Sequence, residues 1–418
     1  MASTPPDDTS KFVRYASVSH AFTPAAPVDD TSLFADRPQQ VMRCLDALFQ
    51  RGLHIALYGE RGVGKTSLAN VLPKLIRGGK LPQLDGLRVD CNTNDNYRSI
   101  WRKVLRELGQ PLKEEWAEAS LDPEDVRYRL QRLERRTLIV LDELDRVEND
   151  EGLSLLADTV KTLSDHSVDV TLMLVGVATS VEHLIGEHES IVRSLVQVHM
   201  PRMSYHELGA ILDKGFSLVG IDISPDARNR IIHEAEGLPH FVHLLGLHAG
   251  QFAVLDDRNT VESPDVARAI REAVDSHSML SEYQRATQSP QPEHLFEEVL
   301  LACAFAPRNE LGYFRAGDVR EPLSAIVGRD MRIPSFQRHL NEFSGPNRGY
   351  VLQKDGVPRH YIYRFRNPLL QPFIKMRGEA KKLITEELRE ILQTRQEAQN
   401  APTLFDGQAE SDSTTDES

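Results

Sequence analysis

The sequence predicts an α/β protein with a parallel sheet, helices on both faces of that sheet, and two further regions after it. Over the first half of the chain, short apolar runs of buried-strand character alternate with helical stretches, a pattern typical of parallel sheets. From residue 204 to about 274 only helical patterns occur. Three more helical patterns then precede two short strands around Asp355 and Gly356, which indicates a hairpin.

The composition narrows the class of protein. The 418 residues are 40% hydrophobic and 27% charged, an ordinary balance for two or three globular domains. The apolar runs have strand length and the N-terminus lacks an export signal, so we expect neither a membrane span nor secretion. The three cysteines are scattered, which argues against disulfides and a zinc site and fits a reducing cytoplasm. A net charge of −13 argues against a chain that coats nucleic acid over its whole surface.

The elements of the predicted sheet follow one another in a regular order. A leader rich in Ser, Thr, Pro and Asp covers residues 1–20 and is expected to be disordered. Strands are predicted at 54–58, 87–91, 137–141, 168–176 and 195–200. Helices are predicted at 39–51, 67–76, 99–108, 113–119, 123–134, 152–164 and 181–185. Because helices separate the strands, we expect parallel pairing throughout.

A glycine-rich loop connects the first strand to the helix at 67–76. Residues 59–66 read Gly-Glu-Arg-Gly-Val-Gly-Lys-Thr and match G-x-x-x-x-G-K-[ST] in a strand–loop–helix context. Glycines allow the turn in which successive N–H groups surround a polyphosphate at a helix N-terminus. Lys65 would reach the β- and γ-phosphates, and the Thr66 hydroxyl would bind Mg²⁺. The residues predicted to bind the nucleotide here are Gly59, Gly62, Val63, Gly64, Lys65, Thr66 and Ser67.

Two adjacent carboxylates follow the strand at 137–141. Asp142 and Glu143 would lie at the carboxyl edge of the sheet, where α/β proteins bind ligands. Asp142 is predicted to hold Mg²⁺, and Glu143 to be the general base that polarises the attacking water. A capping role is the alternative for an isolated acidic pair, but the glycine loop upstream favours the catalytic interpretation. The sequence therefore predicts a site that binds and hydrolyses a nucleoside triphosphate.

These two motifs resemble those of AAA+ ATPases of the origin-recognition, or replication-initiator, type. The resemblance covers residues 22–274 and, more loosely, the C-terminal helices and hairpin. It implies a P-loop NTPase parallel sheet with a helical lid, ATP and Mg²⁺ as ligands, and a winged-helix domain. The expected parts are a leader at 1–20, an ATPase core at 21–202, a lid at 203–280, a linker at 281–292, a winged helix at 293–378, a charged helix at 379–396 and a disordered acidic tail at 397–418.

The resemblance also implies roles for single polar residues. Thr179, with Ser180 beside it, would contact the γ-phosphate or the attacking water at the end of the fourth strand. Arg193 would be the finger that stabilises charge in a neighbouring subunit's site, so the active form would be an oligomer or a hetero-complex. An exposed structural arginine is the alternative. Arg37 would lie near the nucleotide. His240 stands where the family's second sensor has an arginine, a departure that predicts slow hydrolysis and is similar to STAND signalling ATPases.

The C-terminal domain is basic within an acidic protein. Residues 301–382 contain 15 Lys or Arg and 7 Asp or Glu, an excess of 8 positive charges. Three helices and a hairpin make a winged-helix arrangement, with the helix at 335–343 as the predicted recognition helix. The residues expected to contact nucleic acid are Gln337, Arg338, Arg359, Arg364 and Arg366.

The sequence leaves two main functions open, and a degenerate nucleotide-binding adaptor is a third option that ATP turnover lost in Glu143→Gln would exclude. The first is an ATP-binding, slowly hydrolysing switch whose nucleotide state controls assembly and a winged helix that contacts double-stranded DNA. The second is a STAND-like signalling ATPase, for example in defence against phage, whose winged helix binds a protein partner. Salt-sensitive binding of a DNA duplex favours the first function over the second.

Overall fold

The computed structural model describes residues 8–34, 37–77, 84–110, 121–177, 189–276, 279–290, 294–309, 312–358 and 360–400. The chain divides into two compact units, Met1–Ala269 and Ile270–Ser418. The boundary expected at residue 280 falls instead in the middle of helix α11 (Ser263–Ser276). The end of α11 belongs to the second unit because Arg377 there donates a hydrogen bond of 3.0 Å to the Val274 carbonyl.

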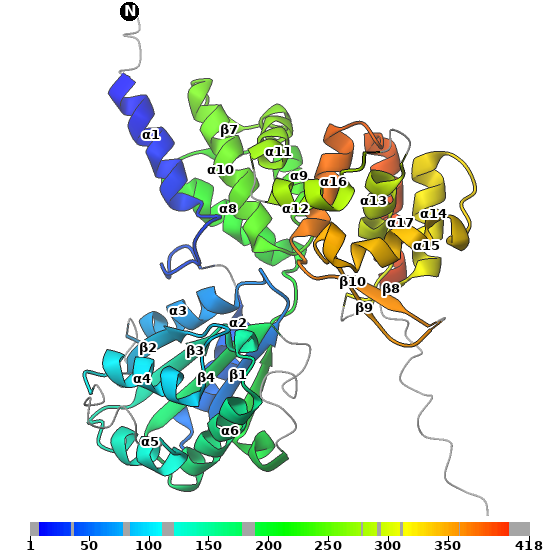
Figure 1. The fold of residues 1–418 in the computed structure, drawn as a ribbon. Coiled ribbons are helices and arrows are strands. Elements are labelled where there is room, and N and C mark those ends of the chain that lie inside the picture. Colours follow the sequence, from blue (N-terminus) through cyan, green and yellow to red (C-terminus); the bar gives the residue numbers. More distant parts are fainter. Residues whose placement is uncertain are drawn as a thin grey trace, which may run out of the picture. The chain divides into compact units, whose positions relative to one another are not determined.

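Five parallel strands form the sheet of the first unit (Figure 1). They are β1 (His54–Gly59), β2 (Asp85–Asp90), β3 (Thr137–Asp142), β4 (Val170–Val177) and β5 (Leu195–His199). Their order is β2-β3-β4-β1-β5, and each neighbouring pair is parallel. The predicted parallel sheet is therefore confirmed. Because parallel strands end at one edge, the glycine loop after β1 and the carboxylates after β3 lie on the same side of the sheet.

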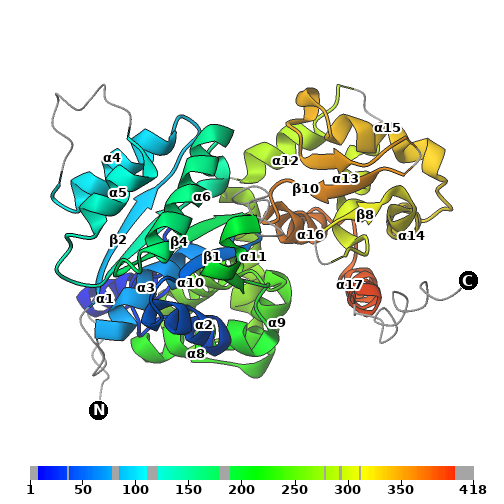
Figure 2. The ribbon, with the colours of Figure 1, turned by 90° about the horizontal axis from the view of Figure 1, so that it is seen from below.

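Helices cover both faces of this sheet (Figure 2). One face packs against α4 (Tyr97–Glu107), α5 (Pro123–Leu130) and α6 (Asp150–Asp165), and the other against α2 (Pro38–Phe49) and α3 (Lys65–Arg77). Successive strand side chains point to opposite faces, so Ala56 joins the first core while Ile55 and Leu57 are buried on the other side. Continuous apolar strands of this kind are required wherever both faces are covered.

A helical lid follows β5 within the first unit. It contains α8 (Tyr205–Val219), α9 (Pro225–Ala235), α10 (Pro239–Leu255), the first half of α11 and the short parallel pair β6 (Asp222–Ile223) and β7 (Thr260–Val261). Ser204 begins α8 with a capping box, in which its hydroxyl and the Glu207 carboxylate satisfy each other's backbone N–H groups. The sequence signal for this helix start is local, and it lies next to residue 203, where the lid was expected to begin.

The prediction of a disordered leader over residues 1–20 is wrong for residues 8–20. Helix α1 (Asp8–Ala21) packs along α8 and α10 of the lid. Phe22 at its end is fully buried, and a Cβ on Gly215 or Gly246 would come within 2.5 Å or 2.7 Å of the Phe22 ring. The two glycines therefore make the space that receives this ring, a long-range fit that composition alone does not reveal.

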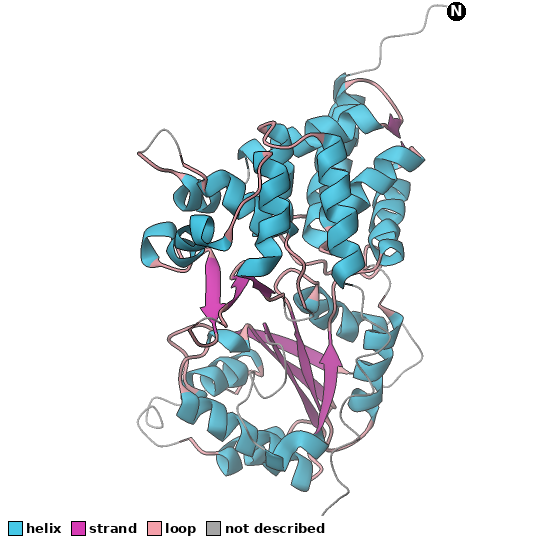
Figure 3. Cartoon of the chain, turned by 90° about the vertical axis from the view of Figure 1, so that its right-hand side faces the viewer, coloured by secondary structure: helices cyan, strands magenta, loops and turns pink. Residues whose placement is uncertain are grey.

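The second unit is a winged helix with additions (Figure 3). Its elements are α12 (Met279–Thr287), α13 (Phe296–Phe305), β8 (Phe314–Arg315), α14 (Ala316–Val327), α15 (Ile333–Phe343), β9 (Leu352–Asp355), β10 (Ile362–Phe365), α16 (Leu370–Ala380) and α17 (Glu386–Asn400). The strands are antiparallel in the order β8-β10-β9. The predicted three helices and hairpin are confirmed, and β8 adds a third strand.

Two predictions for the second unit are corrected. The linker expected at 281–292 is largely helical, because α12 extends to Thr287 and its Tyr283 and Ala286 are buried. The charged helix expected at 379–396 belongs to two helices, since α16 ends at Ala380 and Lys382 takes a left-handed conformation with φ 59°. The second of them, α17, packs on α13 and α16.

Candidate nucleotide-binding site

Three glycines shape the loop between β1 and α3. Gly59, Gly62 and Gly64 have φ angles of 150°, 86° and 96°, which L side chains rarely adopt. At Gly59 the fit is also steric, because a Cβ there would lie 2.3 Å from the Met200 carbonyl oxygen. The loop thus lies directly against the chain segment that leads from β5 into the lid.

Lys65 is the first residue of α3 and is 8% exposed. Its ammonium donates hydrogen bonds to the carbonyl oxygens of Gly59, at 3.0 Å, and Glu60, at 2.7 Å. Burial lowers the pKa of Lys65 to about 8, although the carboxylates of Asp145 and Asp142 act in the opposite direction. The loop therefore holds a desolvated cation, which a triphosphate would stabilise.

Asp142 and Thr66 meet at the carboxyl end of β3. Asp142 is buried, accepts a hydrogen bond from the Thr66 side chain, and accepts another of 2.9 Å from the Glu143 backbone N–H. Burial raises the pKa of Asp142, and these two hydrogen bonds oppose the increase. A hydroxyl beside a carboxylate suits Mg²⁺, which takes few protein ligands and completes its shell with water and phosphate oxygens. The residues present thus fit the predicted metal.

Glu143 has a different environment from Asp142. Its backbone is left-handed, with φ 56°, and its side chain is 51% exposed. The carboxylate accepts a hydrogen bond of 2.7 Å from Arg146. A non-glycine residue with this backbone conformation is uncommon and concentrates at functional sites. Glu143, the predicted general base, therefore lies at the carboxyl edge of the sheet, but its carboxylate is ion-paired with Arg146.

Arg37 connects the glycine loop to the lid. The side chain is buried, with 2% of the residue exposed, and Nη2 donates hydrogen bonds to the Pro201 carbonyl at 2.9 Å and the Val63 carbonyl at 3.4 Å. Glu207 of α8 lies 3.4 Å from Nε, which has no well-formed hydrogen bond within the described residues. Burial lowers the pKa of Arg37. The predicted nucleotide-binding role thus falls on a residue that already bridges loop and lid.

Two further predicted residues face the segment after α1. His240, in the first turn of α10, has its Nδ1 3.0 Å from the Pro24 carbonyl oxygen. The Ser67 hydroxyl accepts a hydrogen bond of 3.1 Å from the Val28 N–H. Both contacts tie the segment at 23–28 to the site, one from the lid and one from α3.

The remaining catalytic predictions fall at or beyond the edge of the described residues. Arg193 is exposed in the short 3₁₀ segment η3 (Glu189–Ser194), just before β5. Thr179 and Ser180 lie outside the described residues, as does Arg359 of the second unit. The sensor and finger roles therefore stay predictions.

Charged neighbours of the motif were not predicted from the sequence. Glu60, inside the glycine loop, accepts a hydrogen bond of 2.6 Å from Arg202, and Arg88 of β2 has Nε 3.8 Å from the Asp142 carboxylate. For the Glu60–Arg202 ion pair, the sequence signal was limited to the acidic charge of Glu60 within the loop, because Arg202 is far away in the sequence.

The predicted nucleic-acid residues of the second unit lie on α15 and the hairpin. Gln337 donates a hydrogen bond of 2.9 Å to the Tyr363 hydroxyl, and Arg364 donates two to Gln353, at 2.9 and 2.8 Å. Arg338 has a side chain that is 84% exposed and ion-paired with Glu342, and Arg366 lies 5.5 Å from the Tyr350 ring centre. These cations are at the surface, and several already contact neighbouring side chains.

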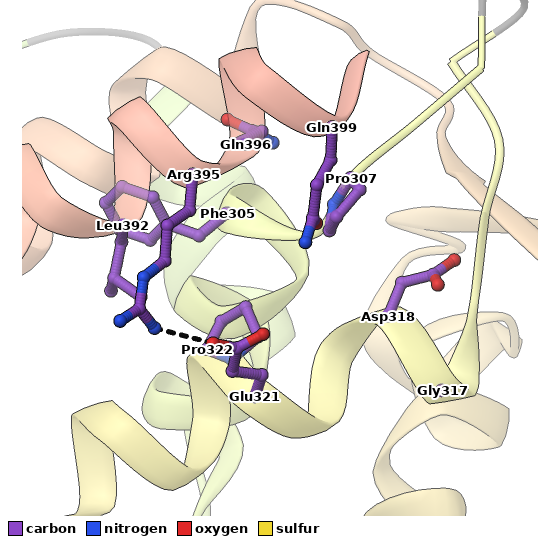
Figure 4. Close-up of a pocket in the computed structure, with 10 residues that line it drawn as sticks. All are labelled: Phe305, Pro307, Gly317, Asp318, Glu321, Pro322, Leu392, Arg395, Gln396 and Gln399. Atoms are coloured by element: carbon purple, nitrogen blue, oxygen red, sulfur yellow. Dashed lines mark hydrogen bonds and ion pairs between the residues drawn. The ribbon is translucent and has the colours of Figure 1, made fainter. Parts of the chain in front are cut away.

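A cavity of about 160 Å³ lies in the second unit between α14 and α17 (Figure 4). Arg395 and Glu321, which both line the cavity, form an ion pair of 2.5 Å. Its lining contains none of the residues predicted to bind the nucleotide.

In the described part of the chain, no helix has the length and apolar character needed to cross a membrane. The same residues contain no group of three or more His, Cys, Asp or Glu side chains arranged to hold a metal ion.

The strand order, the glycine loop and the carboxylates after β3 together define a P-loop ATPase domain with a helical lid. The sequence profile of the AAA domain family matches residues 49–185, from the end of α2 to beyond β4. This segment is similar to AAA domains, in agreement with its motifs.

Individual relatives are distant. An ORC1-type DNA replication protein of Picrophilus torridus is 30% identical over 139 residues, 31% of this chain and 33% of the relative, so the match spans about a third of that protein's length. Two solved structures are similar in fold. Cdc6p of Pyrobaculum aerophilum has a TM-score of 0.47 at 17% identity, over 88% of this chain and 98% of its own. The ORC1 protein of Aeropyrum pernix, in complex with DNA, has a TM-score of 0.49 at 16% identity, over 87% and 97%.

Proposed function

We propose that this chain is an ATP-dependent molecular switch. It binds ATP with Mg²⁺ at the glycine loop, hydrolyses it slowly, and changes its lid and its assembly state with the nucleotide. The observation that carries the proposal is the buried Lys65 ammonium beside the Thr66–Asp142 pair, at the edge where β1 and β3 end. A desolvated cation next to a hydroxyl and a carboxylate suits a metal-bound triphosphate.

Slow hydrolysis follows from the state of the base. Glu143 would take the proton of the attacking water, but its carboxylate is held by Arg146 at 2.7 Å. This hydrogen bond holds a carboxylate oxygen of Glu143 toward Arg146, and it must be released before that oxygen can accept a proton from water. Release of this ion pair in an assembly, with Arg193 of another subunit supplying positive charge, would activate the site.

The proposed partner of the second unit is double-stranded DNA. The excess of 8 positive charges between residues 301 and 382 and the exposed Arg338 on α15 support it. The relatives in Picrophilus and Aeropyrum, a DNA replication protein and a protein solved with DNA, point in the same direction. The active form would be a homo-oligomer or a hetero-complex in the ATP state.

Two measurements test this function. Calorimetry of the full chain with ATP and Mg²⁺ should show saturable binding, and the absence of heat from ATP and its non-hydrolysable analogues contradicts the proposal. Titration of a fluorescent duplex should then show binding that weakens steeply with salt. Mass measurement with and without the analogue tests assembly.

A STAND-like signalling ATPase with a protein partner is the second candidate. It is favoured by the internal contacts of Gln337 and Arg364, which bond to Tyr363 and Gln353 instead of facing solvent freely. His240 at the start of α10 also departs from the arginine of hydrolytic relatives. ATP binding without duplex binding at low salt supports this candidate over the first.

A further inference from the structure

The glycine loop at residues 59–66, which is the phosphate loop of the nucleotide site, contains a carboxylate. Glu60 directly follows Gly59, so its backbone forms part of the cradle in which a triphosphate would lie. An unpaired negative charge there would repel the phosphates at short range. Its Oε2 instead accepts a hydrogen bond of 2.6 Å from Nε of Arg202, and both side chains are largely shielded from solvent. Arg202 therefore neutralises the acid and holds it in one orientation.

Arg202 also contacts the turn that precedes α10 of the lid. Its Nη1 donates a hydrogen bond of 3.2 Å to the Glu236 carbonyl. A Cβ on Gly237 would lie 2.7 Å from the Arg202 Cβ, and the Met203 N–H donates 2.8 Å to the Gly237 carbonyl. Gly237 has φ 81°, a conformation that favours glycine. This turn is thus packed directly on Arg202.

A continuous series of hydrogen bonds connects the phosphate site to the lid. Lys65 Nζ donates to the Glu60 carbonyl at 2.7 Å, the Glu60 carboxylate accepts from Arg202, and Arg202 donates to Glu236. A phosphate that attracted Lys65 would compete with its hydrogen bond to Glu60 and so would disturb the loop's contact with Arg202. Movement of the lid turn would affect the loop by the same route, because coupling between two sites is reciprocal.

We propose that Arg202 is a positioning residue that neutralises Glu60 and couples the phosphate loop to the lid turn at 236–237. The inference rests on the proposed ATP binding at this loop. Arg202 does not contact the nucleotide itself; it acts through Glu60. Two separable effects follow, one on ATP affinity through charge and one on the lid through the hydrogen-bond series.

The test uses the full chain and a set of four variants. Arg202→Ala removes the guanidinium that neutralises the Glu60 charge near the phosphates, and ATP affinity should fall about tenfold at low salt. Glu60→Gln removes the charge and should bind ATP as well as the unaltered chain. Glu60→Gln with Arg202→Ala should recover most of the lost affinity. Arg228→Ala, which breaks a lid ion pair with Asp213 of 2.9 Å away from the loop, is the matched control and should leave affinity unchanged.

Lid movement is read by a pair of fluorescent labels. Cysteines introduced at Met42 of α2 and Leu218 of α8 are exposed, and Cys44, Cys91 and Cys303 are buried and will label slowly. Addition of the ATP analogue should change energy transfer in the unaltered chain and in Arg228→Ala. The change should be lost in Arg202→Ala and in the double variant, even at saturating nucleotide.

Several outcomes would overturn the inference. Equal affinity in Arg202→Ala and the unaltered chain, or a full label response in the double variant, removes the coupling role. If Arg202→Ala does not fold, the test uses the charge-reversed pair Glu60→Arg with Arg202→Glu. If this double variant lacks the ATP-dependent change in energy transfer that the unaltered chain shows, the result counts against the proposal. If the unaltered chain binds no ATP, the proposed function fails and the inference fails with it. Binding in the unaltered chain with no effect of Arg202→Ala contradicts the inference alone.

Discussion

The phosphate loop at residues 59–66 and the wing, which is the hairpin of β9 and β10, both present cations, but they hold them in opposite ways. In the loop, Lys65 is buried and bonds to the carbonyls of its own loop, and its pKa is lowered to about 8. On the wing, Arg364 lies 4.8 Å from the Tyr313 ring centre and Lys354 lies 3.6 Å from that of Tyr361, and neither is fully buried. Because Lys65 is buried, its charge depends on a ligand of matching charge and shape, whereas Arg364 and Lys354 remain in contact with water.

The different burial of these cations indicates which of the two sites is suited to selective binding of its ligand. A desolvated amine is stabilised strongly by one ligand of the right geometry, and so the loop is suited to selective binding of a triphosphate. Guanidinium groups resting on aromatic rings stay exposed to salt, and so the wing is suited to an extended polyanion that it attracts at longer range. The predictions below test whether the two sites differ in this way.

The largest expected effect is on hydrolysis at the loop. Glu143→Gln keeps the shape of the side chain but removes the general base, and turnover should fall by about 10²–10⁴-fold while ATP binding is retained. Phosphate release under steady-state conditions measures it, with calorimetry for the binding. Normal turnover in this variant would move the base to another residue. Arg193→Ala should lower turnover without weakening binding, and serves as the parallel test of the finger.

The next effect is on affinity. Lys65→Ala removes the buried ammonium and should weaken ATP binding on the order of 100-fold, because truncation of one partner of a buried charge pair leaves the other without compensation. Calorimetry with Mg²⁺ measures the change. Lys74→Ala on the same helix, where the amine is exposed and pairs with Asp29, is the matched control. Unchanged affinity in Lys65→Ala would contradict the loop assignment.

A smaller effect concerns pH. The pKa of Lys65 is lowered to about 8 by burial, so the free site loses its ammonium as the pH rises through that value. If only the protonated form binds ATP, affinity should fall about tenfold between pH 7 and pH 9, and binding near pH 8.5 should take up a proton. Calorimetry in buffers of different ionisation enthalpy detects the uptake. Lys65→Arg, which cannot deprotonate, should bind with no such dependence, and a flat profile in the unaltered chain would argue against the buried cation.

The smallest effect is expected at the wing. Replacing Arg364 and Arg366 together with Ala should weaken duplex binding by a few-fold and reduce the slope of log affinity against log salt by about one per arginine. Arg395→Ala on α17, which removes one positive charge from the same unit outside the hairpin, is the control. A duplex affinity that is insensitive to both changes and to salt would favour a protein partner for the winged helix.

Local signals account for what could be predicted about the site. Gly59 to Ser67 are consecutive, and the residue types in that order have few other uses, so loop, lysine and metal hydroxyl could be assigned without coordinates. Asp142 and Glu143 could be assigned because a buried strand precedes them. The different environments of these two carboxylates, one buried and one paired with Arg146, depend on packing that the strand pattern does not encode.

Contacts between distant segments account for what could not be predicted. Glu60 and Arg202 are 142 positions apart, and nothing in either neighbourhood indicates the other. Helix α1 was predicted to be part of a polar leader, because the burial of Val18 and of Phe22 just after the helix depends on glycines in α8 and α10 that are distant in the sequence. Helix α17 is similar, since its charged sequence conceals the side chains of Leu392 and Gln396, which are buried in the second unit.

The order of strands and helices along the chain, the phosphate loop with its neighbouring acids and the winged-helix pattern could all be predicted from the amino-acid sequence. Each of these depends on residues close together in the chain, whose backbone preferences and periodic burial act locally. The folded structure was needed to show which charges meet across the loop and the lid, and which polar-looking helices are anchored to a core. Those outcomes depend on long-range packing, in which shape and charge must match between segments that only the folded chain brings together.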